Sequence, residues 1–318
     1  MPDSPAPYVP TWSPRLEWTG APAPIVEWVA AELGEPVVGA TGQTGGFSSG
    51  IASVVRTASG RTALVKVAHA ALNPVTPRMF RHEIAVNALL PAQAPVPLMR
   101  SHFDNGEWVG LLFDAVDGGP PKWPWTEPQL AATLDALALL RDTLTPAPAA
   151  AYDLPIAPKL LREDIGAGAR LVELRPVELD PWTALHLDRL AGLADRVAVA
   201  GDTLVNFDVR ADNTLIDRSG RAWIVDWSWG CVGAAFCEAV VLLVNAGVAG
   251  HDPQAWLTRS TAAAAPDQQV DAFLAMLIGM WAEAILLPEP VGTAGMRAFQ
   301  RAHLTAAQRW LQQRWDGR

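Results

Sequence analysis

The chain is poor in cysteine and in positive charge. Its 318 residues include only two cysteines, Cys231 and Cys237, which cannot build a disulfide framework. No histidine lies near them to complete a zinc site. Lys and Arg number 24 against 33 Asp and Glu, so the net charge is −9 and the pI is near 5.1. We therefore expect buried thiols in a reducing cytoplasm and no nucleic-acid partner, because nucleic-acid binders normally present a basic face.

Segments for export or membrane insertion are also missing. No positively charged leader with an apolar core opens the chain, so we expect no secretory signal. The longest apolar stretches, 234–250 and 272–287, are short for a membrane span and are interrupted by polar residues such as Asn245 and Glu283. Half of the residues are apolar and 18% are charged. These proportions predict a compact soluble protein with core helices and no membrane partner.

Several catalytic signatures are absent. The sequence has neither a Walker loop ending in Gly-Lys-Ser/Thr nor a G-x-S-x-G nucleophile elbow. The stretch "RHEIAVN" at 81–87 lacks the second histidine of a zinc-protease helix. These absences argue against P-loop enzymes, serine hydrolases and metalloproteases.

The texture of the sequence changes along the chain. Residues 1–24 are rich in proline, which predicts an extended or loosely docked tail. In 25–115, after a short amphipathic piece, β-branched runs separated by Gly-rich turns predict an antiparallel sheet, with one main helix over "TPRMFRHEIAVNALLP". Residues 116–318 are Ala/Leu-rich, and a hairpin at 204–227 interrupts the predicted helices, about 127–143, 181–199, 234–249, 253–264, 267–287 and 295–315. We expect an α+β fold of two lobes, a small N-terminal sheet lobe and a larger helical C-terminal lobe.

The stretch "LVNFDVRADNTLIDRSGRAWIVDWSWG" at 204–230 carries the strongest chemical signal. A loop bearing Asp208 and Asn213 is followed by a strand, a turn and a returning strand that ends at Asp226. Such a hairpin brings the three side chains to one end, where two carboxylates and an amide oxygen can orient a hydroxyl and hold Mg²⁺. Asp208 and Asn213 also suit an ordinary turn. The apolar strand leading into Asp226 favours the functional interpretation.

A Gly-rich segment lies between two predicted strands. In "TGGFSSG" at 44–50, Gly45, Gly46, Ser48 and Ser49 would let backbone N–H groups approach phosphates. The segment is not a complete G-x-G-x-x-G motif, and a plain hairpin turn explains it as well.

A lysine stands in the middle of the apolar strand "ALVKVA". Burial of Lys66 is costly unless the ammonium group is paired, and Glu83 on the following predicted helix is a candidate partner. Solvent exposure of both side chains is the alternative. A Lys–Glu pair of this kind holds the α- and β-phosphates in kinases.

The motifs and their order resemble those of the aminoglycoside phosphotransferase family. This family includes choline-kinase-like small-molecule kinases and has a fold similar to that of protein kinases. The resemblance covers about 35–290. It implies that Asp208 is the catalytic base and that Asn213 and Asp226 are Mg²⁺ ligands. It also suggests that Arg210 faces the transferred phosphate.

The same resemblance makes 109–119 the hinge between lobes, with the peptides of Asp114 and Val116 against the adenine ring. Glu238 matches an acidic residue that props the catalytic loop, although a carboxylate in the first turn of a helix needs no such role. The family has a histidine where this chain has Asn206. Because an amide can still donate a hydrogen bond, we expect Asn206 to brace the loop.

The expected function is transfer of the γ-phosphate of ATP, or of GTP, to a hydroxyl of a small molecule, with Mg²⁺ as cofactor. A metabolic kinase for an endogenous amino alcohol, sugar or amine is the alternative within the enzyme class, and a nucleotide-binding pseudokinase with a regulatory role is the alternative outside it. The acidic composition suits a cationic substrate, although it also serves solubility. Candidate acceptor contacts are Asp252, Asp267, Asp271, Glu283, Glu289, Trp227, Trp229 and Trp281.

Overall fold

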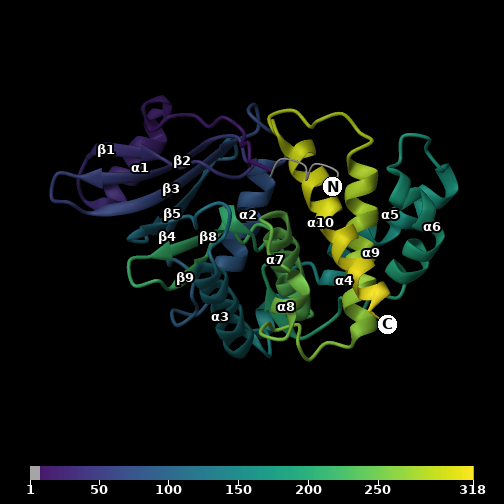
Figure 1. Cartoon of the computed structure of the whole chain (residues 1–318). Helices are drawn as coiled ribbons and strands as arrows, with labels where there is room; N and C mark the ends of the chain where they lie inside the picture. Colours follow the sequence, from purple (N-terminus) through teal and green to yellow (C-terminus); the bar gives the residue numbers. More distant parts are fainter. Residues whose placement is uncertain (1–7, 318) are drawn as a thin grey trace.

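The computed structural model describes residues 8–317, so residues 1–7 of the predicted proline-rich tail lie outside the described residues. Figure 1 shows a lobe built around a sheet beside a larger helical lobe. The sheet is antiparallel with the strand order β1-β2-β3-β5-β4. Its strands are β1 (Val37–Gly42), β2 (Ile51–Thr57), β3 (Thr62–His69), β4 (Met99–Asp104) and β5 (Trp108–Asp114). The predicted α+β, two-lobed, protein-kinase-like architecture is confirmed.

Two helices pack on this sheet. Helix α1 (Ala23–Leu33) buries Ile25, Val29 and Leu33, which recur every four residues and so share one helical face. Helix α2 (Thr76–Asn87) begins with Pro77, whose fixed φ suits a first turn. It lies against β3 and β5, which brings its buried face to the strand that carries Lys66.

The helical lobe surrounds two small sheets. Strands β8 and β9 form the predicted hairpin and β6 pairs with β8, while β7 pairs with β10. The elements of this lobe are β6 (Gly118–Gly119), α3 (Glu127–Leu144), η2 (Ala149–Asp153), α4 (Ala157–Leu160), α5 (Arg162–Leu174), α6 (Pro181–Ala194), β7 (Thr203–Val205), η3 (Ala211–Asn213), β8 (Thr214–Asp217), β9 (Ala222–Ile224), β10 (Cys231–Gly233), α7 (Phe236–Val248), α8 (Pro253–Leu257), α9 (Asp267–Ala284) and α10 (Met296–Asp316). Within residues 8–317, no helix combines the length and apolarity that membrane crossing requires.

The helix predicted over 253–264 is shorter in the structure and ends at Leu257. The side chain of Ser260 explains the early end. Its Oγ donates to Leu257 O at 2.7 Å and accepts from Ala262 N at 3.1 Å. A serine side chain that takes up nearby backbone groups competes with the helical pattern, so the chain turns here.

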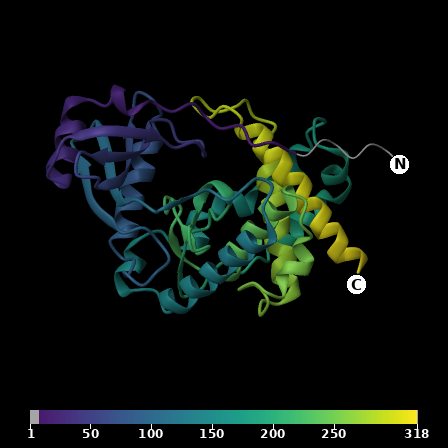
Figure 2. The same cartoon turned by 60° about the vertical axis from the view of Figure 1, so that its left-hand side comes forward.

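Residues 8–17 join the two lobes. Leu16 forms a bridge with Ile51 of β2, and Tyr8 O accepts a hydrogen bond from Trp123 Nε1 of the helical lobe at 2.9 Å. In Figure 2 this purple segment runs from the sheet past α10 and the loop that precedes it. The described part of the predicted tail is therefore docked across both lobes, followed by the short helix η1 (Trp18–Gly20).

Candidate active site

The loop between β7 and β8 carries the first part of the site. Asn213 Nδ2 donates to Asp208 Oδ2 at 2.8 Å and to Asp208 O at 2.9 Å, which fixes the spacing of the two side chains. Arg210 contacts Asp208 Oδ1 through Nη1 and donates from Nε to Asp212 Oδ1 at 2.7 Å. Burial raises the pKa of Asp208 to about 7 although Arg210 opposes the shift. Asp208 is therefore a carboxylate with a pKa suited to proton transfer near neutral pH.

Backbone strain is concentrated at this site. Among residues 8–317, the non-glycine residues with positive φ are Arg175 (40°), Phe207 (63°) and Asp226 (60°). Arg175 ends helix α5, where a left-handed conformation is common. Phe207 directly precedes Asp208, and Asp226 lies two residues after the end of β9. Side chains held by such costly conformations often belong to functional sites.

Asn206 and Glu238 hold the loop in place. Asn206 is completely buried, its Oδ1 accepts from Asp208 N at 2.9 Å, and its Nδ2 donates to Asp226 O at 2.9 Å. Glu238 Oε1, in the first turn of α7, accepts from Asn206 N at 2.5 Å. Asn206 thus connects the two backbone segments that carry Asp208 and Asp226.

We expect Asn206→Ala to lower turnover by about 30-fold, because it removes two hydrogen bonds that each contribute roughly 1 kcal/mol. Asn206→His should preserve or improve turnover, since a neutral imidazole also offers one donor and one acceptor. Steady-state kinetics on both variants, with thermal melts to verify folding, test this. A steep loss of turnover in a well-folded Asn206→His protein would show that the amide has another role.

A buried ion pair faces the loop from the sheet. Lys66 Nζ lies 2.6 Å from Glu83 Oε2 and 3.6 Å from Asp226 Oδ2. Burial opposes the charge on Lys66, but Asp226 and Glu83 outweigh it, so the pKa of Lys66 is raised. Burial also opposes the charge on Asp226, yet Lys66, Ser228 and Arg210 keep its pKa below the usual value. Lys66 and Asp226 are therefore both charged at neutral pH.

The donor set fits a magnesium ion bound together with phosphates. Among the described residues, no cluster of three or more His, Cys, Asp or Glu side chains could hold a metal alone. Asn213 turns its amide nitrogen to Asp208, which leaves Oδ1 without a hydrogen bond from residues 8–317. Asp226 supplies a carboxylate whose Oδ1 accepts from Ser228 Oγ at 2.6 Å. Mg²⁺ usually takes one or two such protein oxygens and completes its shell with water and substrate phosphates.

These groups line a cavity between the lobes, here called the interlobe cavity, which includes Lys66, Asn213 and Asp226. Gly45 and Gly46 also line it, with φ of 115° and 76° that disfavour other residues. A Cβ on Gly45 would lie 3.4 Å from Asp212 Cβ, so the Gly-rich loop closes onto the catalytic loop.

The two serines of the Gly-rich segment lie elsewhere. Neither Ser48 nor Ser49 lines the interlobe cavity. Ser49 Oγ donates to Gly292 O at 3.0 Å, in the connection between α9 and α10. The structure therefore places Ser49 at a contact between the lobes, and the preceding Thr44–Gly46 stretch at the cavity.

Arg15 is a member of the interlobe cavity that the sequence patterns did not reveal. Its Nη2 donates to Gly45 O at 2.6 Å, and its buried Nε has no hydrogen-bond partner among residues 8–317. Burial lowers the pKa of Arg15, while Asp226 and Asp212 attract the charge. The proline-rich segment thus places the Arg15 guanidinium group, whose Nε has no hydrogen-bond partner among residues 8–317, in the cavity that contains Lys66 and Asp226.

Solved structures with the same architecture include small-molecule phosphotransferases. Spectinomycin phosphotransferase APH(9)-Ia in complex with ADP and spectinomycin aligns with a TM-score of 0.61 and 11% identity over 92% of this chain and 97% of that one. APH(4)-Ia in complex with AMP-PNP and hygromycin B aligns with a TM-score of 0.61 and 15% identity over 92% of this chain and 98% of that one. A choline kinase from Streptococcus pneumoniae gives 0.58 and 12% over 89% and 97%. The chain has the aminoglycoside phosphotransferase fold. No family model and no curated protein matches the sequence.

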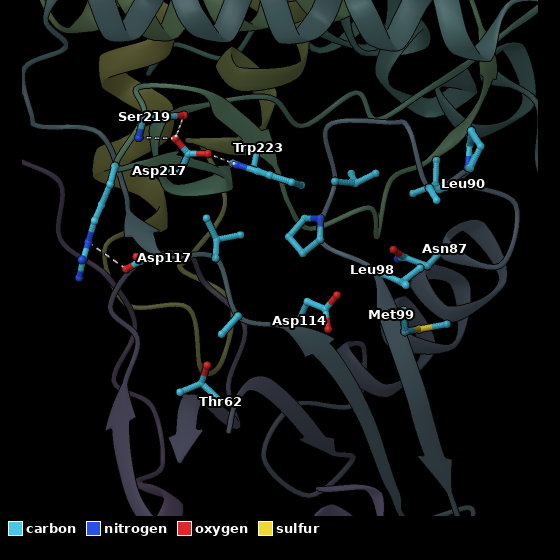
Figure 3. Close-up of a pocket in the computed structure, with 17 residues that line it drawn as sticks. Thr62, Asn87, Leu90, Leu98, Met99, Asp114, Asp117, Asp217, Ser219 and Trp223 are labelled. Carbon is cyan, nitrogen blue, oxygen red and sulfur yellow. Dashed lines mark hydrogen bonds and ion pairs between the residues drawn. The ribbon is translucent and has the colours of Figure 1, made fainter. Parts of the chain in front are cut away.

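In this aminoglycoside phosphotransferase fold the connector after β5 borders two cavities. Asp114, Ala115 and Val116 line the interlobe cavity and also a larger one, of about 660 Å³, on the other side of the connector. Figure 3 shows this second cavity, with Asp114 and Trp223 at its wall. It lacks every candidate catalytic or metal-binding side chain, so the smaller interlobe cavity is the candidate site. The Asp114 carboxylate is paired with Arg100, 2.7 Å from its Nε. Of Asp114, only the backbone groups therefore remain for contact with an adenine base.

The other side of the catalytic loop faces a cavity in the helical lobe, here called the helix-lined cavity. Asp208 and Arg210 form part of its wall, together with Trp229 and Trp281. Trp227 instead lies at the interlobe cavity. None of the acidic residues considered as acceptor contacts lines the helix-lined cavity, namely Asp252, Asp267, Asp271, Glu283 and Glu289.

Those acidic side chains have structural partners. Asp271 Oδ1 lies 2.6 Å from Arg314 Nε, and Asp267 lies 2.8 Å from Arg314 Nη2. Glu283 lies 2.6 Å from Arg170 Nε. Asp252 accepts from Gln254 N at the start of α8, and Glu289 accepts from Arg297 N. The ion pairs of Asp267, Asp271 and Glu283 join helices, whereas Asp252 and Glu289 bind the starts of α8 and α10. A sequence without coordinates could not distinguish such roles from substrate contacts.

Proposed function

We propose that the protein transfers the γ-phosphate of ATP to a hydroxyl group of a small molecule. One observation carries the proposal. The catalytic loop separates two cavities, with Asn213 facing the interlobe cavity and Asp208 facing the helix-lined cavity, and a 2.8 Å hydrogen bond joins the two side chains. A nucleotide on one side and an acceptor on the other would then meet at this loop.

Each side chain has a role in this reaction. Lys66, held by Glu83, would bind the α- and β-phosphates. Asn213 and Asp226 would hold Mg²⁺, which when bound neutralises phosphate charge. Asp208 would accept the proton of the acceptor hydroxyl. The hydroxyl oxygen would attack the γ-phosphorus as the bond between that phosphorus and the bridging β-phosphate oxygen breaks. The products are a phosphate monoester and ADP.

Proteins of this fold support the choice of donor and reaction class. Structures of that fold contain ADP with spectinomycin, and AMP-PNP with hygromycin B. The hygromycin B enzyme has been crystallised with an alanine at an aspartate and, separately, at an asparagine five residues further along. Asp208 and Asn213 have the same spacing.

The test is nucleotide turnover by the purified protein with Mg-ATP or Mg-GTP and a panel of small alcohols. We expect ADP release that depends on an acceptor and on Mg²⁺, with one phosphate ester formed per ADP by ³¹P NMR. GTP is the alternative donor, and the ratio of kcat/KM values decides between the two. Nucleotide binding that is unaffected by Mg²⁺, without transfer to any acceptor, would instead support the pseudokinase alternative.

Arg15 should contribute to nucleotide binding. Replacing it with glutamine removes a buried cation beside Asp226, and we expect KM for ATP to rise about tenfold, as loss of a charge-assisted hydrogen bond implies. Arg15→Lys should restore part of the affinity. Arg56→Gln, on an exposed position of β2, is the matched control. An unchanged KM in a folded Arg15→Gln protein would assign Arg15 to lobe contacts alone.

A further inference from the structure

The helix-lined cavity has a wall unlike that of a site for a polycationic sugar. Its volume is about 280 Å³, near the lower end of the ~300–1,000 Å³ range of small-molecule pockets. Aromatic and sulfur-containing side chains from five separate segments dominate the wall: Phe47, Phe207, Trp229, Phe273, Met276, Met280, Trp281, Met296 and Phe299. Such a wall stabilises an apolar body by burying its surface.

The polar side chains of this wall are largely engaged with the protein. Asn245 accepts from Trp125 Nε1 at 2.9 Å and from Ala211 N at 3.2 Å, and its Nδ2 lies 3.0 Å from His303 Nε2. Gln300 Oε1 accepts from Arg297 at 2.6 Å. A ligand with many hydroxyl and amino groups would therefore bury several of them without partners, and each such group would weaken its binding.

One charged group of the wall remains available. The carboxylate of Asp164, in the first turn of α5, accepts no hydrogen bond from residues 8–317. The other charged members, Asp208 and Arg210, are paired with each other. An unpaired carboxylate in a partly buried place favours a cation as its partner.

We propose that the acceptor is a small alcohol with a single amino group and an apolar body that is an aromatic ring or has a similar shape. The amine binds Asp164, the body fills the aromatic wall, and the hydroxyl reaches Asp208. This inference rests on the proposed phosphotransferase function and names the substrate class for the same site. The transferred phosphate ends on the acceptor oxygen, and the hydroxyl proton passes to Asp208.

The Gly-rich loop contributes to the same pocket. Phe47 at its tip lies 5.3 Å from Phe299 of α10 and 5.4 Å from Trp12 of the N-terminal segment, measured between ring centroids. The loop that approaches the nucleotide therefore also closes one side of the acceptor site. Phe47→Ala should raise KM for the acceptor more than KM for ATP.

The charge of Asp164 sets a pH dependence. Burial raises its pKa to about 6; Arg170 opposes this shift, while Glu163 and Glu283 add to it. Since Asp164 is protonated below that pH, affinity for an amine should fall as the pH drops from 7 to 5. A neutral alcohol of the same shape should show a smaller fall, because it meets only Asp208, whose pKa of about 7 affects both ligands alike.

The experiment measures binding by calorimetry and transfer by ³¹P NMR for 2-amino-3-phenylpropan-1-ol, its amine-free analogue 3-phenylpropan-1-ol, and kanamycin. We expect the aryl amino alcohol to bind at least about tenfold more tightly than either of the others, as one charged contact implies. Asp164→Asn should abolish the advantage over the amine-free analogue. Glu173→Gln, at an exposed position near the other end of α5, is the matched control.

The outcomes separate this inference from the proposed function. Binding of the aryl amino alcohol through Asp164 without phosphate transfer would uphold the acceptor class and overturn the phosphotransferase proposal. Phosphorylation of kanamycin in preference to the aryl amino alcohol would uphold the reaction and overturn the acceptor class. Equal affinities for the two phenylpropanols in the wild-type protein would also overturn the role of Asp164.

Discussion

Replacing Asp208 with asparagine should lower turnover about 10²- to 10⁴-fold, the range that loss of a general base produces. Nucleotide affinity should change little, because Asp208 faces the helix-lined cavity and not the interlobe cavity. Asparagine keeps the size of the side chain but cannot take the hydroxyl proton. Single-turnover transfer from radiolabelled ATP, with nucleotide affinity measured by calorimetry, separates the two effects.

A matched control for this variant is Asp142→Asn, because the Asp142 side chain is 63% exposed on α3 and, among residues 8–317, pairs only with Arg141. It should turn over like the wild type. If Asp208→Asn retained more than about a tenth of wild-type turnover, Asp208 would not be the base. If both proteins bound nucleotide but neither transferred phosphate, the pseudokinase alternative would gain support.

The candidate catalytic hairpin was predictable because its residues are local in sequence. Asp208, Asn213 and Asp226 lie within one loop and one strand pair, so their spacing and the apolar strand before Asp226 together predicted that they meet. Lys66 and Glu83 were also within reach, since a lysine in an apolar strand demands a partner and the next helix offers one. Because the helix that follows the strand packs against it, the side chains of Lys66 and Glu83 can meet in few other ways.

The proposed acceptor site was not predictable in the same way. Its wall brings together Phe47 and Asp164 with residues of α7, α9 and α10, which are distant in sequence. Arg15 gave no signal either, because a proline-rich segment shows neither a period nor a motif that would place it at a cavity. Only tertiary packing brings these side chains to the site.

Helix α5 shows the same limit for secondary structure. It contains Gly166 and Gly168, which weaken intrinsic helix preference, and no helix was expected there. Packing explains it, since a Cβ on Gly168 would lie 3.1 Å from Ala191 Cα and one on Gly279 would lie 3.1 Å from Gly168 N. The close approach of α5 to α6 and α9 positions Asp164 at the helix-lined cavity, so this unpredicted helix carries the charged group of the acceptor proposal.

Replacing Asp226 with asparagine should remove the dependence of ATP binding on Mg²⁺ and lower turnover by at least about 10²-fold, as loss of a preorganised charge at a phosphate site implies. The carboxylate is the charged member of the metal-binding pair, and it also attracts Lys66 from 3.6 Å. Asparagine leaves an amide oxygen that binds Mg²⁺ more weakly. The wild-type protein should bind ATP more tightly with Mg²⁺ than with EDTA, whereas the variant should show equal affinities.

Calorimetry in both conditions measures this difference directly, and Asp135→Asn on the exposed side of α3 serves as the control. The design also separates metal binding from folding, because a variant that merely loses stability would lose affinity in EDTA as well. A variant that kept the full Mg²⁺ effect would exclude Asp226 as a ligand. Asn213 could not then hold the ion alone, since the described residues offer no other cluster of metal-binding side chains, and the Mg²⁺ site proposed at the catalytic hairpin would be wrong.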